Sequence, residues 1–526
     1  MIIPMNQYIR SLTLTLSIFI PLTFINVSES SELSEAKITL NDLYLFDEIS
    51  SIDVSHSAKQ IAYSVSSVDE KKDRYRNDIW LLDVNKNKKK VLIKGRPWVG
   101  KTKFSPDDTL LGYLAPGRGQ YSEYQQIWTI NTNYRTKRQL TKLKANINDF
   151  EWSPDGTQMI LVADSISVDK KTKSSVQTQK PIVIDRYYFK EDGKEFLGDE
   201  RQHLHLLDIK SRTTKQLTKG TSNEILPSWS PDSKKIAYVT KTGEMDRTNN
   251  YDVYVLEIDS TNNPIQLTTN LGADSSSSRP QWSPDGKKIA YLHGGDPALL
   301  WYALQELAVI DLDTKINSIL TKELDRNVSS PQWSDDGQSI YFVIEDNMKS
   351  QLAKYSLTNQ KIKKITPSNY YISGWAKNYV VRNGKIGLIL SNTNSPDEVY
   401  FYDENSLSQQ SHHNSELLSS RKILKTETIS FKAADGEELF GMMIKPDNFD
   451  PSKQYPLIIR MHGGPVSQYG LYFNYDWQLF AANDYVVMGI NPRGSSGRGL
   501  NFQKMIFADW GNVDADDISQ LADYAI

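Results

Sequence analysis

The chain has 526 residues, of which 39% are hydrophobic and 24% charged; this allows two or three folded domains and excludes a single small module or a wholly disordered chain. Its 61 basic and 64 acidic residues give a net charge of −3, so we expect no nucleic-acid partner. The absence of cysteine excludes disulfides, thiolate nucleophiles and cysteine-ligated metals.

The amino terminus has the order of a secretory signal. Arg10 precedes an apolar run at residues 12–27, and small polar residues follow from Ser28. This predicts a signal peptide over residues 1–28. An uncleaved anchor is the alternative, but the run contains Pro21 and is shorter than the roughly 20 apolar residues of a bilayer span. We therefore expect a periplasmic or secreted protein with no integral membrane span after cleavage.

One pattern recurs along residues 36–405: an aromatic or apolar residue, then Ser-Pro-Asp-Gly or a variant, then an alternating apolar strand. Its serine stands at Ser55, Ser105, Ser153, Ser230, Ser283 and Ser334, about 50 residues apart except for a longer interval after Ser153. Proline presets the second turn position and glycine ends a type I turn, so each copy predicts a hairpin corner.

Further strands follow each corner, as at residues 78–83 and 252–257. Four strands in about fifty residues are typical of a propeller blade. With a weaker seventh unit at residues 377–403, the pattern predicts an all-β, seven-bladed β-propeller over residues 36–405.

The long interval after Ser153 contains Asp192-Gly193 between aromatic residues, which predicts an additional hairpin. This hairpin either decorates a blade edge or brings Arg186 or Tyr188 to the substrate. His203 and His205 alternate on one strand without a third ligand nearby, so we interpret them as ordinary strand positions. No metal site and no cofactor is expected.

The pattern changes after residue 405. Residues 406–425 are polar and predict a linker, and residues 426–526 read as the start of an α/β domain. A hairpin at residues 428–444 precedes a buried strand that ends in His462-Gly463-Gly464-Pro465. A helix and a strand then lead to Asn491-Pro492-Arg493-Gly494-Ser495, followed by two further helices.

A propeller with Ser-Pro-Asp-Gly corners, followed by the His-Gly-Gly-Pro and Asn-Pro-Arg-Gly-Ser motifs, resembles the prolyl oligopeptidase family of serine peptidases, in its acylaminoacyl-peptidase and dipeptidyl-aminopeptidase-like branch. The resemblance implies an α/β-hydrolase domain and a peptide substrate. It also implies that the backbone N–H of Gly464 is an oxyanion donor and that His462, Gly463 and Pro465 support its loop. Arg493 either contacts substrate or braces the site.

The sequence departs from this family because it contains no Gly-x-Ser-x-Gly, the motif that carries the nucleophile. We therefore expect no catalytic residue within the chain, and an incomplete α/β-hydrolase domain over residues 426–526. The favoured hypothesis is a truncated serine peptidase that releases N-terminal or acylated aminoacyl units from short peptides through a Ser-Asp-His triad beyond residue 526. The alternative is a non-catalytic TolB-like propeller that binds peptides or proteins.

Overall fold

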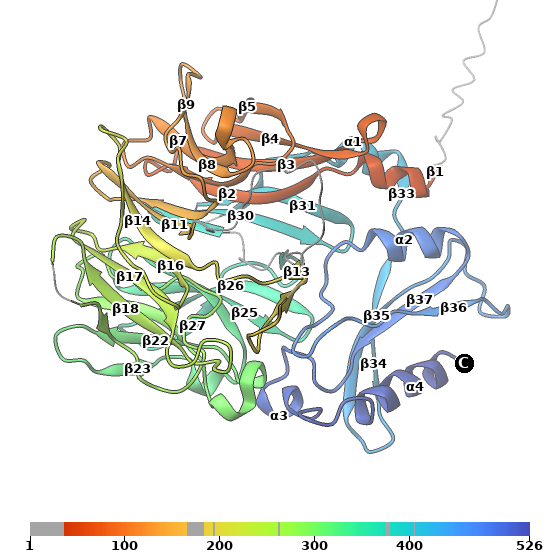
Figure 1. Cartoon of the computed structure of the whole chain (residues 1–526). Helices are drawn as coiled ribbons and strands as arrows, with labels where there is room; N and C mark the ends of the chain where they lie inside the picture. The colour runs from red at the N-terminus through yellow and green to blue at the C-terminus, as the bar shows by residue number, and fades with distance from the viewer. Residues whose placement is uncertain (1–35, 166–182, 193–194, 261–262, 374–378, 404–405) are drawn as a thin grey trace, which may run out of the picture.

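The computed structural model of the chain describes residues 36–165, 183–192, 195–260, 263–373, 379–403 and 406–526. The predicted signal peptide at residues 1–28 lies outside the described residues. A large ring of β-sheets stands beside a smaller α/β part (Figure 1). Among the described helices, none is long and apolar enough to cross a bilayer.

Seven antiparallel sheets follow one another along the chain, and we number them one to seven. The first four are β2 (Glu48–Val54), β3 (Gln60–Asp69), β4 (Arg74–Asp83) and β5 (Lys88–Arg96); β6 (Gly100–Phe104), β7 (Leu110–Pro116), β8 (Gln125–Asn131) and β9 (Lys137–Gln139); β10 (Ile147–Trp152), β11 (Gln158–Asp164), β14 (Gln202–Asp208) and β15 (Thr214–Gln216); and β16 (Glu224–Trp229), β17 (Lys235–Lys241), β18 (Tyr251–Glu257) and β19 (Ile265–Gln266).

The last three sheets are β20 (Gln281–Trp282), β21 (Lys288–His293), β22 (Glu306–Asp311) and β23 (Asn317–Ile319); β24 (Val328–Trp333), β25 (Ser339–Asp346), β26 (Lys349–Ser356) and β27 (Ile362–Lys364); and β28 (Tyr371–Ile372), β29 (Tyr379–Arg382), β30 (Lys385–Asn392), β31 (Ser395–Tyr402) and β32 (Leu407–Gln409). In sheet seven both β28 and β29 pair with β30, so its innermost strand is in two pieces. The predicted seven-bladed propeller is confirmed.

The predicted corners join neighbouring sheets through their tryptophans. Each indole N–H donates to the carbonyl that precedes the aromatic residue of the preceding corner: Trp152 to Lys103 (3.1 Å), Trp229 to Glu151 (3.2 Å), Trp282 to Ser228 (3.2 Å) and Trp333 to Gln281 (2.9 Å). The tryptophan of the motif is therefore a link between blades as well as a core residue.

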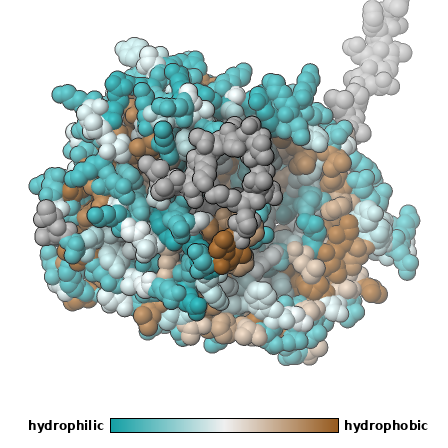
Figure 2. Space-filling view, in the orientation of Figure 1, coloured by the Kyte–Doolittle hydropathy of each residue, from teal (hydrophilic) through white to brown (hydrophobic). Residues whose placement is uncertain are grey.

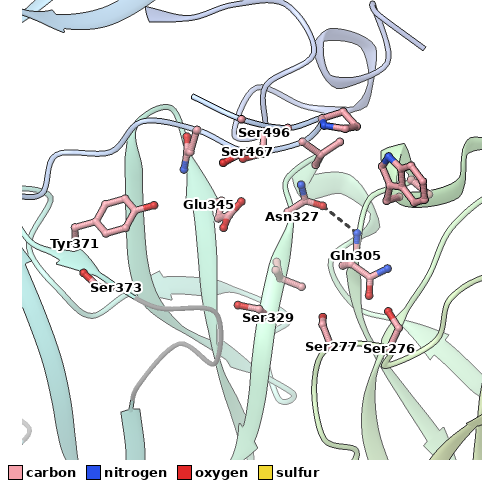
Figure 3. Close-up of a pocket in the computed structure, with 18 of the residues that line it drawn as sticks. Ser276, Ser277, Gln305, Asn327, Ser329, Glu345, Tyr371, Ser373, Ser467 and Ser496 are labelled. Carbon is pink, nitrogen blue, oxygen red and sulfur yellow. Dashed lines mark hydrogen bonds between the residues drawn. The ribbon is translucent and has the colours of Figure 1, made fainter. Parts of the chain in front are cut away.

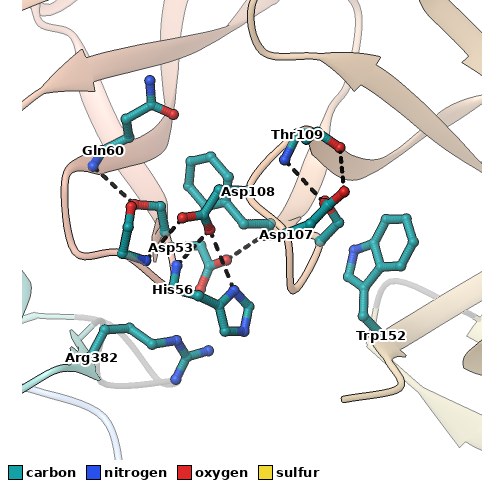
Figure 4. Close-up of polar contacts among 12 residues, drawn as sticks. Asp53, His56, Gln60, Asp107, Asp108, Thr109, Trp152 and Arg382 are labelled. Carbon is teal, nitrogen blue, oxygen red and sulfur yellow. Dashed lines mark hydrogen bonds and ion pairs between the residues drawn. The ribbon is translucent and has the colours of Figure 1, made fainter. Parts of the chain in front are cut away.

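The junction of sheets one and two lacks this tryptophan and uses carboxylates instead (Figure 4). The backbone N–H of Phe104 donates to Asp53 at 2.8 Å, and Asp108 accepts from the N–H groups of His56 at 2.6 Å and Ser57 at 2.9 Å. The ring closes where β2 packs on sheet seven through a core that includes Val54 and Val399. Within the described residues, sheets one and seven share no strand.

The structure moves the predicted domain boundaries. β32 lies within the segment assigned to a linker at residues 406–425, because it pairs with β31 as the outer strand of sheet seven. The rest of that segment contains α1 (Ser415–Ser419) and β33 (Arg421–Lys422). At the other end, β1 (Ala36–Lys37) pairs with β33, so the first sheet begins at Glu48 instead of residue 36.

The α/β part has one sheet in the order β34-β35-β37-β36, with only β36 and β37 parallel. Its elements are β34 (Thr426–Lys432), β35 (Glu438–Ile444), β36 (Leu457–Ile459), α2 (Tyr475–Ala482), β37 (Val486–Asn491), α3 (Leu500–Gln503) and α4 (Val513–Ala525). Trp477 of α2 packs with Val487, whereas Leu521 of α4 packs with Met488. Because successive strand residues point to opposite faces, the two helices cover opposite faces of the sheet.

Smaller elements complete the fold. They are the hairpin of β12 (Lys190–Glu191) and β13 (Glu195–Phe196), and the 3₁₀ helices η1 (Leu40–Leu45), η2 (Glu70–Lys72), η3 (Gly119–Tyr121), η4 (Pro297–Tyr302) and η5 (Lys322–Leu324). Lys190 pairs with Phe196, which confirms the additional hairpin predicted after Ser153.

Candidate functional site

A cavity of about 1260 Å³ lies between the propeller and the α/β part. Its propeller wall comes from sheets four to seven, and its other wall from the segments after β36 and β37. Figure 3 shows Ser467 and Ser496 of the α/β part facing Glu345, Tyr371 and Ser329 of the propeller. The predicted glycines Gly463 and Gly464 and Pro465 belong to this lining, so the predicted oxyanion loop borders the cavity.

Sheet six holds the α/β loops in place. Gln468 accepts a hydrogen bond from the Met348 N–H at 2.9 Å and donates to the Lys349 carbonyl at 3.2 Å. The Asn347 N–H donates to the Gly497 carbonyl at 2.9 Å. These three propeller residues span the turn between β25 and β26, so that single hairpin fixes both loops that border the cavity.

The two glycines leave their peptide units open to the cavity. A Cβ added at Gly463 would meet no atom within 4 Å, and one at Gly464 would meet only the backbone nitrogen of Val466, at 3.4 Å. Neither glycine has a left-handed backbone, and the Gly464–Pro465 peptide is cis. In the part of the chain that the structure describes, the Gly464 N–H donates to no backbone acceptor. It is therefore available to a ligand oxygen.

His462 holds the loop as a neutral imidazole. Its Nδ1 lies 2.9 Å from the Gly463 carbonyl, which only accepts, so Nδ1 carries the proton. Nε2 lies 3.1 Å from the Ser495 hydroxyl, which donates its own proton to the Pro492 carbonyl at 2.6 Å. Burial lowers the pKa of His462, which keeps the ring neutral. Ser495 is 1% exposed, so this Ser–His pair is closed to substrate.

Arg493 is directed into the α/β part. Its Nε donates to the Asp517 carboxylate of α4 at 3.0 Å, its backbone N–H donates to the same carboxylate at 2.8 Å, and Nη1 pairs with Asp435. The hydrogen bond to Asp517 raises the pKa of the guanidinium. Arg493 is 6% exposed and is not among the cavity-lining residues, so its contacts are those of a brace between loop, helix and hairpin.

Among the described residues, the charged side chains that line the cavity are Glu345 and Asp397, both on the propeller wall. Burial raises the pKa of Asp397 to about 6, with repulsion from Glu48 and Glu398 adding to the rise and a hydrogen bond from Ser373 opposing it. The sequence patterns did not identify either acid, because each lies on a strand whose neighbours give no sign that it borders a cavity.

Other residues singled out from the sequence lie elsewhere. Arg186 pairs with Asp246 at 2.5 Å and Tyr188 is 50% exposed; neither lines the cavity. His203 is buried and lies 2.7 Å from Glu224, and burial lowers the pKa of His205 to about 4. Within the described ranges, no group of three or more His, Asp or Glu side chains could hold a metal ion.

Comparisons with known proteins agree with the fold and with the motifs. The model of the prolyl oligopeptidase family matches residues 471–526. An uncharacterized peptidase of Bacillus subtilis, YuxL, is 26% identical over 511 residues, which cover 93% of this chain and 76% of that protein. Dipeptidyl-peptidase 5 of Porphyromonas gingivalis is 27% identical over 303 residues, 55% of this chain and 42% of that protein.

Solved structures show the same architecture. The acylaminoacyl peptidase of Pyrococcus horikoshii superposes with a TM-score of 0.77 at 18% identity, covering 93% of this chain and 72% of that one. A puromycin-hydrolyzing peptidase of Mycobacterium tuberculosis gives 0.69 at 14% identity, covering 93% and 74%. At these identities the likeness establishes the fold.

Proposed function

Since this chain belongs to the prolyl oligopeptidase family of serine peptidases, we propose that it forms the substrate-selecting propeller and the first part of the catalytic domain of an enzyme that hydrolyses short peptides. The observation that carries this proposal is the cavity between the two parts, bordered by the backbone of Gly463 and Gly464. A peptide bound there would place a carbonyl group against open backbone N–H groups. Hydrolysis of an acyl group needs such donors for the negative charge that develops on the carbonyl oxygen.

In this proposal the chain's own residues prepare the oxyanion site. The Gly464 N–H donates to the developing oxyanion. The neutral His462 fixes the peptide unit that carries this N–H, by donating to its carbonyl group, that of Gly463, at 2.9 Å. His462 is not the general base, because its Nδ1 proton is committed to that carbonyl and its Nε2 faces the buried Ser495. Nucleophile, acid and base are proposed to lie beyond residue 526.

The sheet offers a place for the nucleophile. β36 is the outer strand of the described sheet, and only β37 pairs with it there. A parallel strand added at the free edge would end beside the carboxyl end of β36, which leads into Gly463 and Gly464. In α/β-hydrolases the Gly-x-Ser-x-Gly turn follows such a strand. This placement would bring the serine hydroxyl and the Gly464 N–H to the same carbonyl.

We further propose that the enzyme acts outside the cytoplasm, on the basis of residues 1–28, and that it releases N-terminal or acylated aminoacyl units. The propeller encloses one side of the cavity and would admit only short peptides. Size selection is part of this proposal, because the propeller wall formed by sheets four to seven lies across the cavity from the α/β loops.

The test is to express the gene with the reading frame continued past codon 526 and to compare the product with the present chain. We expect the longer protein, and not the present chain, to hydrolyse aminoacyl and acylaminoacyl p-nitroanilides and to be labelled by a fluorophosphonate at a serine beyond Ile526. A stop codon followed by unrelated sequence, or turnover by the present chain, would overturn the proposal.

Gly464→Val tests the oxyanion site in the longer protein. Blocking one donor should lower kcat by about 10²–10³-fold while leaving the free energy of unfolding nearly unchanged. Gly198→Val is the matched control, because a Cβ at Gly198 also meets no atom within 4 Å but the residue lies away from the cavity. Equal losses of kcat and stability at Gly464 would show a structural role instead.

A further inference from the structure

Two segments on the outer side of the propeller contain many basic residues and no acidic ones. Residues 84–96, which include β5 of sheet one, contain six lysines and arginines, and residues 131–144, which include β9 of sheet two, contain five. Neither segment contains an aspartate or a glutamate. The whole chain has 64 acidic residues against 61 basic ones, so this excess of positive charge is local. We call the two segments together the basic flank.

The structure joins the two segments into one surface. β5 and β9 are the outer strands of sheets one and two, and both lie at the upper edge of the ring in Figure 1. Lys90 Nζ donates to the Thr132 carbonyl at 2.9 Å, and the Arg135 guanidinium donates to the Val91 carbonyl. Each segment therefore contacts the other directly, and their cations form a continuous basic surface.

The cations of the basic flank are exposed and close to one another. Ten of the eleven are exposed, and Arg96 is half-buried. In the part of the chain that the structure describes, only Lys86 among them forms an ion pair, with Asp83 at 3.3 Å. Partial burial, together with repulsion from Arg96 and Arg135, lowers the pKa of Lys137. Mutually repelling cations attract an anionic partner, because its negative charge relieves the repulsion.

The residues around these cations favour a membrane as the partner. Tyr134 lies beside Arg135 in the turn between β8 and β9, and it is 83% exposed. Its backbone N–H donates to the Asn131 side chain at 2.8 Å, which fixes the turn. Tyrosine beside clustered basic residues is typical of surfaces that lie in the headgroup layer of a bilayer. Export, which residues 1–28 predict, would separate the chain from nucleic acid and bring it to a membrane surface.

We propose that the basic flank docks the protein on a bilayer that contains anionic phospholipids. Its lysines and arginines pair with the lipid phosphate groups, and the Tyr134 ring lies in the headgroup layer. Sheets one and two form this contact, whereas the propeller wall of the cavity comes from sheets four to seven. Docking therefore uses none of the cavity-lining residues, and the inference is independent of the proposed hydrolysis.

Co-sedimentation with lipid vesicles tests the docking. The probes are vesicles of phosphatidylcholine alone and vesicles that also contain about 30% phosphatidylglycerol, at about 0.1 M salt. We expect the chain to bind the anionic vesicles at least about tenfold more tightly than the neutral ones. This preference should disappear at about 1 M salt, where charges are screened within about 3 Å. Equal binding to both kinds of vesicle at about 0.1 M salt would overturn the proposal.

Charge reversal in each segment locates the contact. The double variant Lys88→Glu, Lys89→Glu changes sheet one, and Lys142→Glu, Lys144→Glu changes the segment that follows β9. Each should weaken binding to the anionic vesicles at least about fivefold, because each basic residue near such a surface contributes to the attraction. The two variants alter separate segments, so loss of folding in one leaves the other to decide.

The matched control makes the same change in net charge elsewhere. Lys361→Glu, Lys363→Glu alters exposed lysines at β27, the outer strand of sheet six, and should leave vesicle binding unchanged. An equal loss in this control would show that only net charge matters, and it would overturn the assignment to the basic flank.

Two further measurements distinguish a membrane from other anionic partners. Tyr134→Ser keeps the net charge and should weaken binding to the anionic vesicles about threefold or more. Unchanged binding would overturn the placement of this ring in the headgroup layer. The second measurement is a titration with duplex DNA and with single-stranded RNA at the same salt. Tighter binding to either of them than to the anionic vesicles would overturn the choice of a membrane.

Discussion

Asp397 is a half-buried acid with a buried Oδ1, and its native environment favours the neutral form. Its pKa rises to about 6 in the folded chain, against about 3.9 in an unfolded one. The folded state therefore binds more protons than the unfolded state between these values, and its stability should fall as the pH rises from about 4 to 6. Above pH 6 both states are ionised, and the whole cost of burying the charge is present.

We accordingly expect Asp397→Asn to raise the free energy of unfolding by roughly 1–3 kcal/mol at pH 7.5 and to have little effect at pH 4. Urea unfolding at the two pH values measures this directly. Asp313→Asn is the exposed control and should change neither value. A destabilised Asp397→Asn chain at pH 7.5 would mean that the carboxylate has a cationic partner in the folded state.

Arg493 and Asp517 form a buried ion pair. Its contribution to stability can be measured separately from any effect on peptide binding. Asp517 is 0% exposed, so Arg493→Met would leave an unpaired charge and should cost about 3–5 kcal/mol. The double variant Arg493→Met, Asp517→Leu should recover most of this loss, because it removes both charges. Denaturant unfolding of the three chains gives the comparison. Weakened peptide binding at unchanged stability would instead indicate that Arg493 contacts substrate.

At the scale of the element, the corner tryptophans allow the blade junctions to be tested. Trp229→Phe removes the indole hydrogen bond to the Glu151 carbonyl, 3.2 Å long, and leaves that carbonyl without this donor. We expect a loss of about 1 kcal/mol beyond the change in ring size, measured as a shift in denaturation midpoint. Trp98→Phe is the control, since Trp98 is 37% exposed. Equal shifts would show that the indole N–H adds nothing to the junction.

These corners also explain why the propeller could be predicted from the sequence. In each Ser-Pro-Asp-Gly turn the chemistry is local: Ser153 Oγ lies 2.6 Å from Asp155 and accepts from the Gln158 N–H at 2.9 Å. Such contacts span five residues, so they leave a repeated pattern in the sequence. No Ser-Pro-Asp-Gly turn adjoins the last strand of sheet seven, β32. The sequence therefore predicts a linker where the structure has this strand.

The sequence predicts residues of only one wall of the cavity, the wall formed by the α/β part. Gly463 and Gly464 stand in a motif, because the loop needs small residues in sequence order. Glu345 and Asp397 share no motif, since the ring places them together only after sheets six and seven have formed. Residues that come from separate blades share no local sequence pattern. The acids of the propeller wall could therefore be identified only from the structure.

β36 is an edge strand of the described sheet in the α/β part. β36 has three residues, all half-buried, and its outer side has no strand beside it in the described part of the chain. Figure 2 shows apolar surface over the α/β part. Large side chains exposed there include Met461 at 68% and Trp510 at 61%.

At the scale of the whole molecule, the propeller and the α/β part are in contact at two separate places, one near η1 and α2 and one near η4 and α3 (Figure 1). On the amino-terminal side, Arg421 pairs with the buried Asp42 at 2.8 Å, and the ring of Phe46 lies 5.2 Å from that of Tyr475. On the other side, Tyr302 of η4 accepts a hydrogen bond from the Trp510 indole at 2.5 Å. These contacts join the α/β part to the propeller from two sides (Figure 1).

Gln503 of α3 is a fully buried residue that hydrogen-bonds the α/β part to the propeller. We expect these hydrogen bonds to make the two parts unfold together. Gln503 is 0% exposed, accepts from the Asn327 amide at 2.8 Å and donates to the Tyr302 carbonyl at 2.8 Å. Gln503→Met keeps the length of the side chain but removes both bonds, leaving two polar groups unpaired. This should weaken the interface by roughly 2–4 kcal/mol.

We expect scanning calorimetry to show one main transition for the unaltered chain and an earlier, separate transition of the α/β part in Gln503→Met. Hydrogen exchange should assign the early step to residues 426–526, while the seven sheets keep their protection. Gln120→Met, an exposed glutamine of the propeller, is the control and should leave the transition unchanged. If Gln503→Met retained a single unshifted transition, the coupling would depend on the contacts of Asp42 and Phe46, and the walls of the cavity would be held from the amino-terminal side.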